Sequence, residues 1–419
     1  MSLPSRCYTC GLVFPTGDAV CPMCQERYSY KIPIYAGQTP LMLRFWPFIV
    51  RHPTSLLYYV CYLARGLNND FYYQSLDWRT GELVSTLSLS SYPANAPVVD
   101  GYGRLIVPIG GSYEVAIIES PTANTIKTID MKALGKPLAC LRNSREQIVA
   151  VYGKDHGAGL LVLDSDGKRV GLEFSPDVYT QDQELIKVTD DKLVFKTPAK
   201  PRNPVWKVFD ANTRKVTLLP TETIGSRLIQ CNSFEDSIAF AAQNKLYLVD
   251  SRCQTRAIDL PAGVAKPTAL CLHHNSGLYI GTHTVQEDGS EEAALHYRSG
   301  DVYTWVPVPT RPHSIALIEN GRALVLAHSK KRGSYLISVD LDETRPDTLA
   351  AVPQSCSTDA LVLHWPAAAF GAGDTLCKRP IYTDSDIPAR AAALPHPVYP
   401  VPAPVIPQQM AAPMPSAVE

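Results

Sequence analysis

Four cysteines near the start of the chain have the spacing of a metal site. They form two Cys-x-x-Cys pairs, Cys7 with Cys10 and Cys21 with Cys24, and ten residues separate the pairs. Two such pairs can supply a tetrahedral set of four thiolates, which suits zinc. Because four protein ligands leave no open position for water or substrate, we expect a structural rather than a catalytic ion. The alternatives are a disulfide, a redox-active Cys-x-x-Cys and an iron centre with the same four sulfurs.

The segment between the two pairs must reverse direction for the four sulfurs to meet. Pro15 and Gly17 give it a turn sequence. With Gly11 after the first pair and Pro22 inside the second, residues 7–24 resemble the short zinc ribbons of the double-zinc-ribbon family. This resemblance implies a structural zinc module that is often used for protein contacts.

A second possible cation site begins at Asp164. With Asp166 and Gly167 it resembles the start of a calcium-binding EF-hand loop, but no glutamate occupies the twelfth position. The same residue types are typical of tight turns. We therefore expect a turn between two strands rather than a calcium site.

Three histidines also lie close together in the sequence. His273 and His274 are adjacent, and His283 follows nearby. Since adjacent side chains on a strand point to opposite faces, we do not expect the three to share an ion. No Gly-x-Ser-x-Gly motif points to a nucleophilic serine either. The sequence therefore predicts no catalytic residues and no cofactor other than one structural zinc ion.

Most of the chain after the cysteines repeats a hairpin at regular intervals. Each hairpin consists of an apolar strand, a polar turn and a second apolar strand, and there are seven of them. Successive turns are 42, 45, 46, 40, 47 and 43 residues apart, which is typical of the four-stranded blades of a β-propeller. We predict an all-β fold with seven blades, with six or eight as alternatives. The turns begin at Asp77, Glu119, Asp164, Asp210, Asp250, Tyr297 and Asp340.

The innermost strand of each blade is expected upstream of its hairpin. Only six such strands are found there. We predict that residues 358–365 supply the missing innermost strand of the first blade and thereby close the ring. The hairpins resemble those of quinoprotein-like and WD40-like propellers, although the Gly-His and Trp-Asp dipeptides of WD40 repeats are not in phase. This resemblance implies an architecture and does not specify a function.

Composition divides the rest of the chain. Residues 41–64 are the most apolar window, but Arg44, Pro47 and Arg51 interrupt it, so it does not qualify as a membrane-spanning helix. In residues 395–415, eight of 21 residues are proline, which predicts a disordered tail. The expected parts are a zinc ribbon at 1–30, a linker or cap at 31–54, a propeller at 55–366 closed by the strand at 358–365, and a disordered proline-rich tail at 367–419.

The charge of the chain is balanced, with 39 Lys plus Arg against 40 Asp plus Glu. Such a balance provides no general attraction to nucleic acid or to an anionic membrane, and we expect neither as a partner. Outside the predicted ribbon, seven cysteines show no pairing pattern, as is common in a reducing compartment. No secretory signal precedes them, and we expect a cytoplasmic protein.

These features favour a non-enzymatic scaffold that binds proteins on a face of the propeller. The alternative is a propeller enzyme with a cofactor or metal in its central channel, of the quinoprotein or lactonase kind. The sequence lacks the in-phase acidic residues that such a channel site would need on the innermost strands. The identity of the protein partners does not follow from the sequence.

Overall fold

The fold consists of β-strands. The computed structural model describes residues 20–21, 27, 29–43, 47–55, 57–154, 157–175, 178, 185–187, 189–197, 205–219, 227–229, 231–232, 238–242, 245–249, 254–260, 267–272, 277–299, 302–317, 322–329, 333–340, 345–352, 361–364, 367–372 and 375–380. Every regular element in these ranges is a strand and none is a helix, which confirms the all-β prediction. No helix able to span a membrane is found in them.

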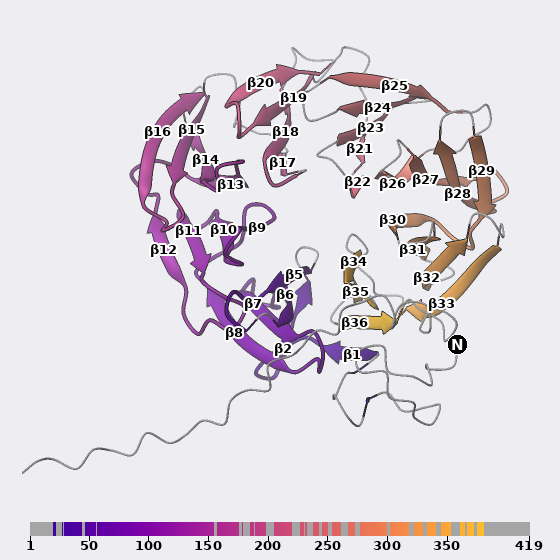
Figure 1. The fold of residues 1–419 in the computed structure, drawn as a ribbon, viewed down its shortest axis with the longest axis horizontal. Helices are drawn as coiled ribbons and strands as arrows, with labels where there is room; N and C mark the ends of the chain where they lie inside the picture. Colours follow the sequence, from indigo (N-terminus) through magenta and orange to yellow (C-terminus); the bar gives the residue numbers. More distant parts are fainter. Residues whose placement is uncertain are drawn as a thin grey trace, which may run out of the picture.

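The strands form eight sheets of four or five strands, arranged in a ring (Figure 1). Sheet 1 contains β4 (Met42–Leu43), β5 (Phe48–Arg51), β6 (Tyr58–Arg65), β7 (Phe71–Asp77) and β8 (Leu83–Leu89). Sheet 2 contains β9 (Val98–Val99), β10 (Leu105–Ile109), β11 (Glu114–Ile118) and β12 (Lys127–Asp130). Sheet 3 contains β13 (Pro137–Arg142), β14 (Ile148–Lys154), β15 (Gly157–Leu163) and β16 (Arg169–Ser175). Sheet 4 contains β17 (Leu185–Lys187), β18 (Lys192–Thr197), β19 (Val205–Asp210) and β20 (Lys215–Leu218).

The second half of the ring continues in the same order. Sheet 5 contains β21 (Arg227–Ile229), β23 (Ile238–Ala242), β24 (Lys245–Val249) and β25 (Thr255–Asp259). Sheet 6 contains β22 (Cys231–Asn232), β26 (Pro267–Leu272), β27 (Leu278–Val285), β28 (Glu291–Ser299) and β29 (Val302–Pro307). Sheet 7 contains β30 (Pro312–Leu317), β31 (Arg322–Ser329), β32 (Gly333–Asp340) and β33 (Arg345–Val352). Sheet 8 contains β34 (Leu361–His364), β35 (Ala367–Ala372), β36 (Thr375–Pro380) and β1 (Tyr30–Pro33). Separately, β2 (Tyr35–Ala36) and β3 (Thr39–Pro40) form a small two-stranded hairpin.

The cores lie between neighbouring sheets. All residues of β10 and β15 are buried, because adjacent sheets cover both faces of these strands. Two-sided burial explains why such strands are continuous apolar runs rather than alternating sequences. Between sheets 2 and 3, for example, Ile106 and Ile117 pack with Ile148 and Leu161. Similar cores of buried apolar residues lie between sheets 1 and 2, 3 and 4, 5 and 6, 6 and 7, and 8 and 1.

The number of sheets differs from the predicted number of blades. All seven predicted hairpins are present, as β7–β8, β11–β12, β15–β16, β19–β20, β24–β25, β28–β29 and β32–β33. The eighth sheet has no such hairpin, because its outer strands β36 and β1 come from opposite ends of the described chain. No turn joins them, and a search for hairpins therefore misses this sheet.

The ends of the chain are also arranged differently from the prediction. The predicted closing strand at residues 358–365 contains β34, which is the first strand of sheet 8 rather than part of sheet 1. The corresponding position in sheet 1 is taken by β5, which pairs with β6. Residues 31–54 thus contain strands of sheets 8 and 1 and the separate β2–β3 hairpin instead of only a linker. The predicted tail at 367–419 begins with β35 and β36. The alanines of β35 have low β propensity, but Ala367, Ala368 and Ala369 are buried, and Ala367 and Ala369 pack in the core shared with sheet 1.

A buried lysine joins the two ends of the chain to sheet 1. Lys378 on β36 is 1% exposed, and its Nζ donates a hydrogen bond to the backbone oxygen of Trp78 at 2.8 Å. The ammonium group also lies 4.6 Å from the centre of the Trp78 ring and 5.6 Å from that of Tyr30 on β1. The adjacent turn needs Gly81, which has a φ of +73° and whose Cβ would lie 2.8 Å from Ile32.

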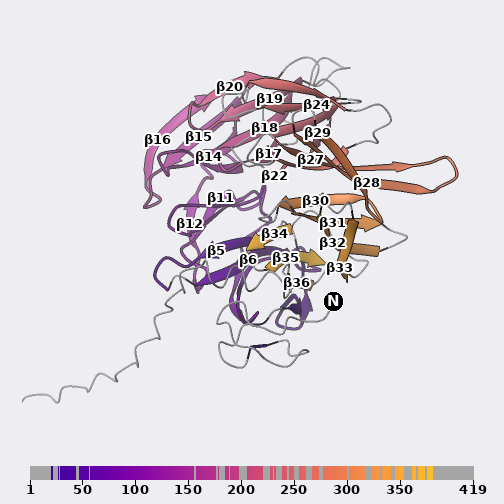
Figure 2. The same ribbon diagram turned by 45° about the vertical axis from the view of Figure 1, so that its right-hand side comes forward.

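Sheet 6 has the longest hairpin. Figure 2 shows β27 and β28 extending away from the ring. The tip between them carries exposed Glu287 and Asp288. Arg298, at the other end of β28, donates a hydrogen bond to the backbone oxygen of Asp259 in sheet 5. The base of the hairpin is thereby attached to its neighbour.

Candidate functional site

Two turns in sheets 2 and 3 share one hydrogen-bonding design. Asp100 Oδ1 accepts hydrogen bonds from the backbone N–H groups of Tyr102 and Arg104, both at 2.9 Å. In sheet 3, Asn143 Oδ1 accepts the equivalent bonds from the residues two and four positions later, at 3.0 and 2.9 Å. Aspartate and asparagine favour such turns because their side chains accept hydrogen bonds from the local backbone.

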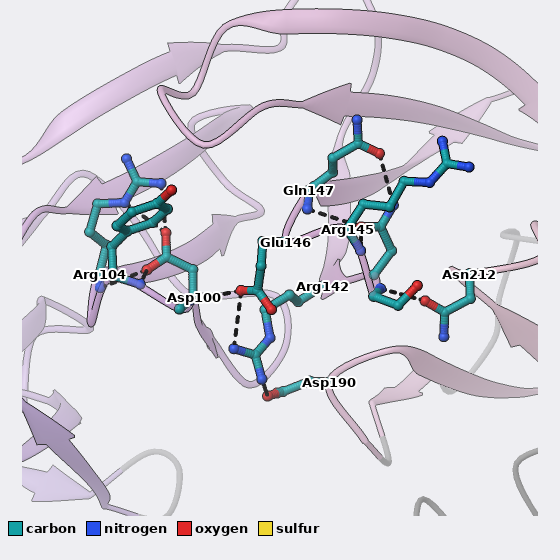
Figure 3. Close-up of polar contacts among 12 residues, drawn as sticks. Asp100, Arg104, Arg142, Arg145, Glu146, Gln147, Asp190 and Asn212 are labelled. Atoms are coloured by element: carbon teal, nitrogen blue, oxygen red, sulfur yellow. Dashed lines mark hydrogen bonds and ion pairs between the residues drawn. The ribbon is translucent and has the colours of Figure 1, made fainter.

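Side chains link these turns to one another and to sheet 4. Glu146 Oε2 accepts a hydrogen bond from the backbone N–H of Gly101 at 3.0 Å, which joins sheets 2 and 3. Asn212 Oδ1 accepts a bond from the backbone N–H of Ser144 at 2.6 Å, which joins sheets 3 and 4 (Figure 3). We call the four turns at residues 100–104, 143–147, 189–191 and 210–214 the turn surface.

Ion pairs stabilise individual turns of this surface and add one link between sheets 3 and 4. The Arg104 guanidinium donates to Asp100 Oδ2 through two nitrogens, at 2.7 and 2.6 Å, and the Asp100 side chain is 1% exposed. Arg142 lies between the carboxylates of Glu146 and Asp190, at 3.5 and 3.2 Å (Figure 3). Charge-assisted hydrogen bonds are shorter and stronger than neutral ones. The Arg104 pair therefore holds its own turn together, whereas Arg142 also joins sheet 3 to sheet 4.

Below the turns, Asp191 is at the centre of a buried polar group. Its carboxylate accepts hydrogen bonds from Lys192 Nζ at 2.9 Å, from Asn212 Nδ2 at 2.7 Å and from Thr189 Oγ1 at 2.7 Å. Lys192 is 1% exposed. Because the carboxylate and the ammonium are paired with each other, this group is suited to structural support rather than to proton transfer.

Two side chains on the turn surface remain available to a partner. Tyr102 is 55% exposed, and its ring centre lies 5.3 Å from the guanidinium carbon of Arg104. Arg145 is exposed, and in the described part of the chain its side chain has no hydrogen bond or ion pair. Tyrosine and arginine are enriched among the residues that dominate protein interfaces. Here both project from turns that are fixed to their neighbours.

A buried lysine lies behind the turn surface. Lys187 Nζ is 2.8 Å from Asp190 Oδ1 and donates to the backbone oxygen of Pro97 at 2.6 Å. Burial lowers its pKa, while Asp190 acts in the opposite direction. Nearby Cys140 is fully buried, and burial raises the pKa of its thiol to about 12. A thiol with this pKa is protonated at neutral pH and is a poor nucleophile.

A second polar group lies in sheet 6. His296 Nε2 is 2.8 Å from Thr282 Oγ1, and its Nδ1 is 2.5 Å from the hydroxyl of Tyr303. Burial lowers the pKa of His296 to about 4, so the ring is neutral at pH 7. Both ring nitrogens already have partners, as a structural histidine requires.

The residues singled out in the sequence have different outcomes. The zinc ligands Cys7, Cys10 and Cys24 lie outside the described residues, while Cys21 is buried. Val20 and Arg27 form an isolated antiparallel bridge around it. The backbone N–H of Arg27 donates to the backbone oxygen of Arg79 at 2.9 Å, so the end of the predicted ribbon contacts sheet 1. The zinc site itself remains a prediction.

The other candidate cation sites were the Asp164 loop and the three histidines. Asp164 Oδ1 accepts hydrogen bonds from the backbone N–H groups of Asp166 and Lys168, at 2.9 and 2.8 Å, which confirms the predicted turn. His283 lies 3.7 Å from the carboxylate of Glu291, whereas residues 273–274 are outside the described ranges. Within those ranges, no three His, Cys, Asp or Glu side chains are grouped as metal ligands would be.

Sequence reasoning missed the turn surface. Tyr102 and Arg145 each lie in a polar turn of ordinary composition. The available signal was the recurrence of Asp100 and Asn143, 43 residues apart, each at the start of a turn between an inner and a second strand. This recurrence predicts two equivalent turns on adjacent blades, but it does not show which side chains connect them.

No protein-family model and no curated protein sequence matches the chain. Several solved structures do. Sqt1 from Saccharomyces cerevisiae is similar with a TM-score of 0.53 and 11% identity, over 85% of this chain and 100% of that one. Virginiamycin B lyase from Staphylococcus aureus gives 0.45 and 9%, over 84% and 99% of the two chains. The WD40 repeats of RRP9 give 0.44 and 12%, over 84% and 97%. At 11% identity the likeness to Sqt1 concerns the fold alone. A ring of sheets that mostly have four antiparallel strands is the architecture of a β-propeller.

Proposed function

We propose that this protein is a non-enzymatic scaffold that binds a protein partner on the turn surface. The observation that carries the proposal is the pair of hydrogen bonds that Glu146 accepts from Gly101 and Asn212 accepts from Ser144. They connect the turns of three sheets and leave Tyr102 and Arg145 exposed on a fixed frame. A partner that binds such a frame orders few protein side chains, which reduces the entropic cost of association.

The proposal includes a closed ring of eight blades. Pairing of β1 with β36 supports it, because this pairing ties the two ends of the described chain into one sheet. It also includes the predicted zinc ribbon as a separate structural module. The backbone bond between Arg27 and Arg79 supports a fixed position for the end of that module.

A double variant, Tyr102→Ala with Arg145→Ala, tests the binding face. Affinity purification of the full chain, followed by mass spectrometry, should identify proteins that are lost with this variant. Tyr113→Ala with Arg256→Ala is the matched control, because both residues are exposed and lie away from the turn surface. The control should retain the same partners.

Two results would contradict the proposal. In the first, the partners of the wild-type chain bind both double variants equally, which places their binding site elsewhere. In the second, a small molecule or metal copurifies with the ring and no protein partner depends on Tyr102 and Arg145. That second result favours the propeller enzyme.

A further inference from the structure

Strand β16 is an exposed edge with an apolar surface. It is the last strand of sheet 3 and pairs with β15, and no other described strand pairs with it. Three of its apolar side chains are largely exposed: Val170 at 52%, Leu172 at 40% and Phe174 at 50%. In the outer strand β8, by contrast, the exposed positions after Val84 are occupied by Thr86 and Ser88. An unpaired edge of this kind can accept an additional strand.

The register shows which side of sheet 3 carries the apolar surface. Leu172 is paired with Leu161, and Phe174 with Gly159. Leu161 belongs to the core between sheets 2 and 3, so Leu172 and Phe174 face the sheet 2 side. The Phe174 ring packs over Gly157, where a Cβ would lie 2.7 Å from its Cζ. The ring is thus held against the backbone of β15 while half of the residue remains exposed.

Positive charges lie at both ends of this surface. Arg169 is paired with Leu163, across a bulge, and therefore lies on the same side as Leu172. At the other end, Lys154 Nζ is 5.9 Å from the centre of the Phe174 ring. The acidic residue of the strand, Glu173, is paired with Leu160 on the opposite side and forms an ion pair with Arg214 of sheet 4.

The same charges argue against a second copy of this chain as the occupant. If two β16 strands paired antiparallel about Leu172, Arg169 of one copy would lie opposite Ser175 of the other. Lys154 of the second copy lies over the adjacent Phe174. Like charges close together across a strand pair are destabilising. An acidic partner removes this repulsion.

We propose that β16 binds an extended peptide segment that adds as a further strand to sheet 3. Backbone hydrogen bonds to the free edge provide affinity, as in other cases of strand addition. Apolar side chains at alternate positions of the peptide cover Leu172 and Phe174, and acidic residues at its ends pair with Arg169 and Lys154. This site lies on the outer rim of the ring and is separate from the turn surface.

The probe for this site is a fluorescent peptide of sequence EEVTITVEE, titrated with the full chain and followed by fluorescence anisotropy. Replacing Leu172→Ser with Phe174→Ser should weaken binding about tenfold or more, since the apolar cover is lost. Leu218→Ser, at an exposed apolar position on the outer strand β20, is the matched control and should leave binding unchanged. A peptide N-methylated on alternate amides, on the side that faces β16, should not bind.

Reversal of charge provides a test that does not depend on loss of binding alone. Arg169→Glu with Lys154→Glu should weaken binding of EEVTITVEE and strengthen binding of KKVTITVKK. The proposal is overturned if EEVTITVEE does not bind the wild-type chain, or if neither double variant, Leu172→Ser with Phe174→Ser or Arg169→Glu with Lys154→Glu, changes its binding. Sedimentation provides a further test. If the wild-type chain is a dimer and the variant Leu172→Ser with Phe174→Ser is a monomer, the edge binds a second copy, and the proposal is overturned.

Discussion

Lys378 and Trp78 are 300 residues apart in the chain, and the Nζ of the lysine donates a hydrogen bond to the backbone oxygen of the tryptophan at 2.8 Å. Lys378 belongs to β36, the last described strand, and Trp78 directly follows β7 of sheet 1. With Tyr30 of β1 on its other side, this lysine connects three parts of the chain that no local turn brings together.

Replacement of this lysine should destabilise the whole ring. In Lys378→Met the apolar stem is kept, but the backbone oxygen of Trp78 loses its donor in a buried environment. We expect the free energy of unfolding to fall by about 2 kcal/mol. Chemical denaturation monitored by tryptophan fluorescence measures it. Lys31→Met, at an exposed position on adjacent β1, is the control, and an equal loss in both variants would contradict the role assigned to Lys378.

Glu146→Ala should loosen the turn surface without unfolding the protein. The carboxylate is partly exposed, so its loss should cost less than about 1 kcal/mol of global stability. The amide of Gly101 should nevertheless exchange with solvent about tenfold faster, because it loses its acceptor. Hydrogen–deuterium exchange of residues 100–104 measures this change. Glu82→Ala, in an exposed turn of sheet 1, should leave exchange at Gly101 unaltered.

The cysteine quartet should bind one zinc ion per chain. Metal analysis of the purified protein should find zinc, and Cys7→Ser with Cys24→Ser should remove it, because each substitution takes away one of the four ligands. Cys140→Ala, in the core between sheets 2 and 3, should retain the metal. Detection of iron in place of zinc, or of zinc in the double variant, would contradict the prediction.

The pKa of His296 predicts a loss of stability in mild acid. Burial lowers this pKa from its ordinary value of 6.5 to about 4, so the unfolded chain binds a proton more readily than the folded chain. The contribution of His296 to the free energy of unfolding is therefore fully present above pH 6.5. It decreases as the pH falls towards about 4. Allowing for screening by nearby solvent, we expect the effect to be about 2 kcal/mol.

His296→Gln should flatten this pH dependence. Denaturation of the variant and of the wild type at a series of pH values between neutral and mildly acidic measures the difference. His52→Gln, at a turn of sheet 1, controls for removal of a histidine elsewhere. If the wild type and His296→Gln lose stability in parallel, another group is responsible for the pH dependence.

The local part of the fold could be predicted from the sequence. The turns at Asp77, Asp164 and Asp210 are marked by side chains that accept hydrogen bonds from the next residues, and this chemistry is contained in a few consecutive positions. All seven hairpins could therefore be found. The pairing of β1 with β36 joins the first and the last described strands, and no local sequence pattern predicts it.

The candidate site shows the same limit. Asp100 and Asn143 predict their own turns. The contact of Glu146 with Gly101, however, depends on how sheets 2 and 3 pack against each other, and their core residues determine that. Residues 367–369 belong to the predicted tail but are buried in β35, and only the packing of sheet 8 against sheet 1 shows this.

Sheet 8 also constrains how this protein can be made. Among the described strands, β1 is synthesised first and its partner β36 is synthesised last. Until then β1 has no sheet to join, and sheets 1 and 7 each present one face that sheet 8 will later cover. Formation of sheet 8 therefore has to wait for β36 and has to close a long loop, which carries an entropic cost. A chain truncated before Thr375 lacks the partner of β1, and the strand edges that this leaves open favour aggregation and degradation.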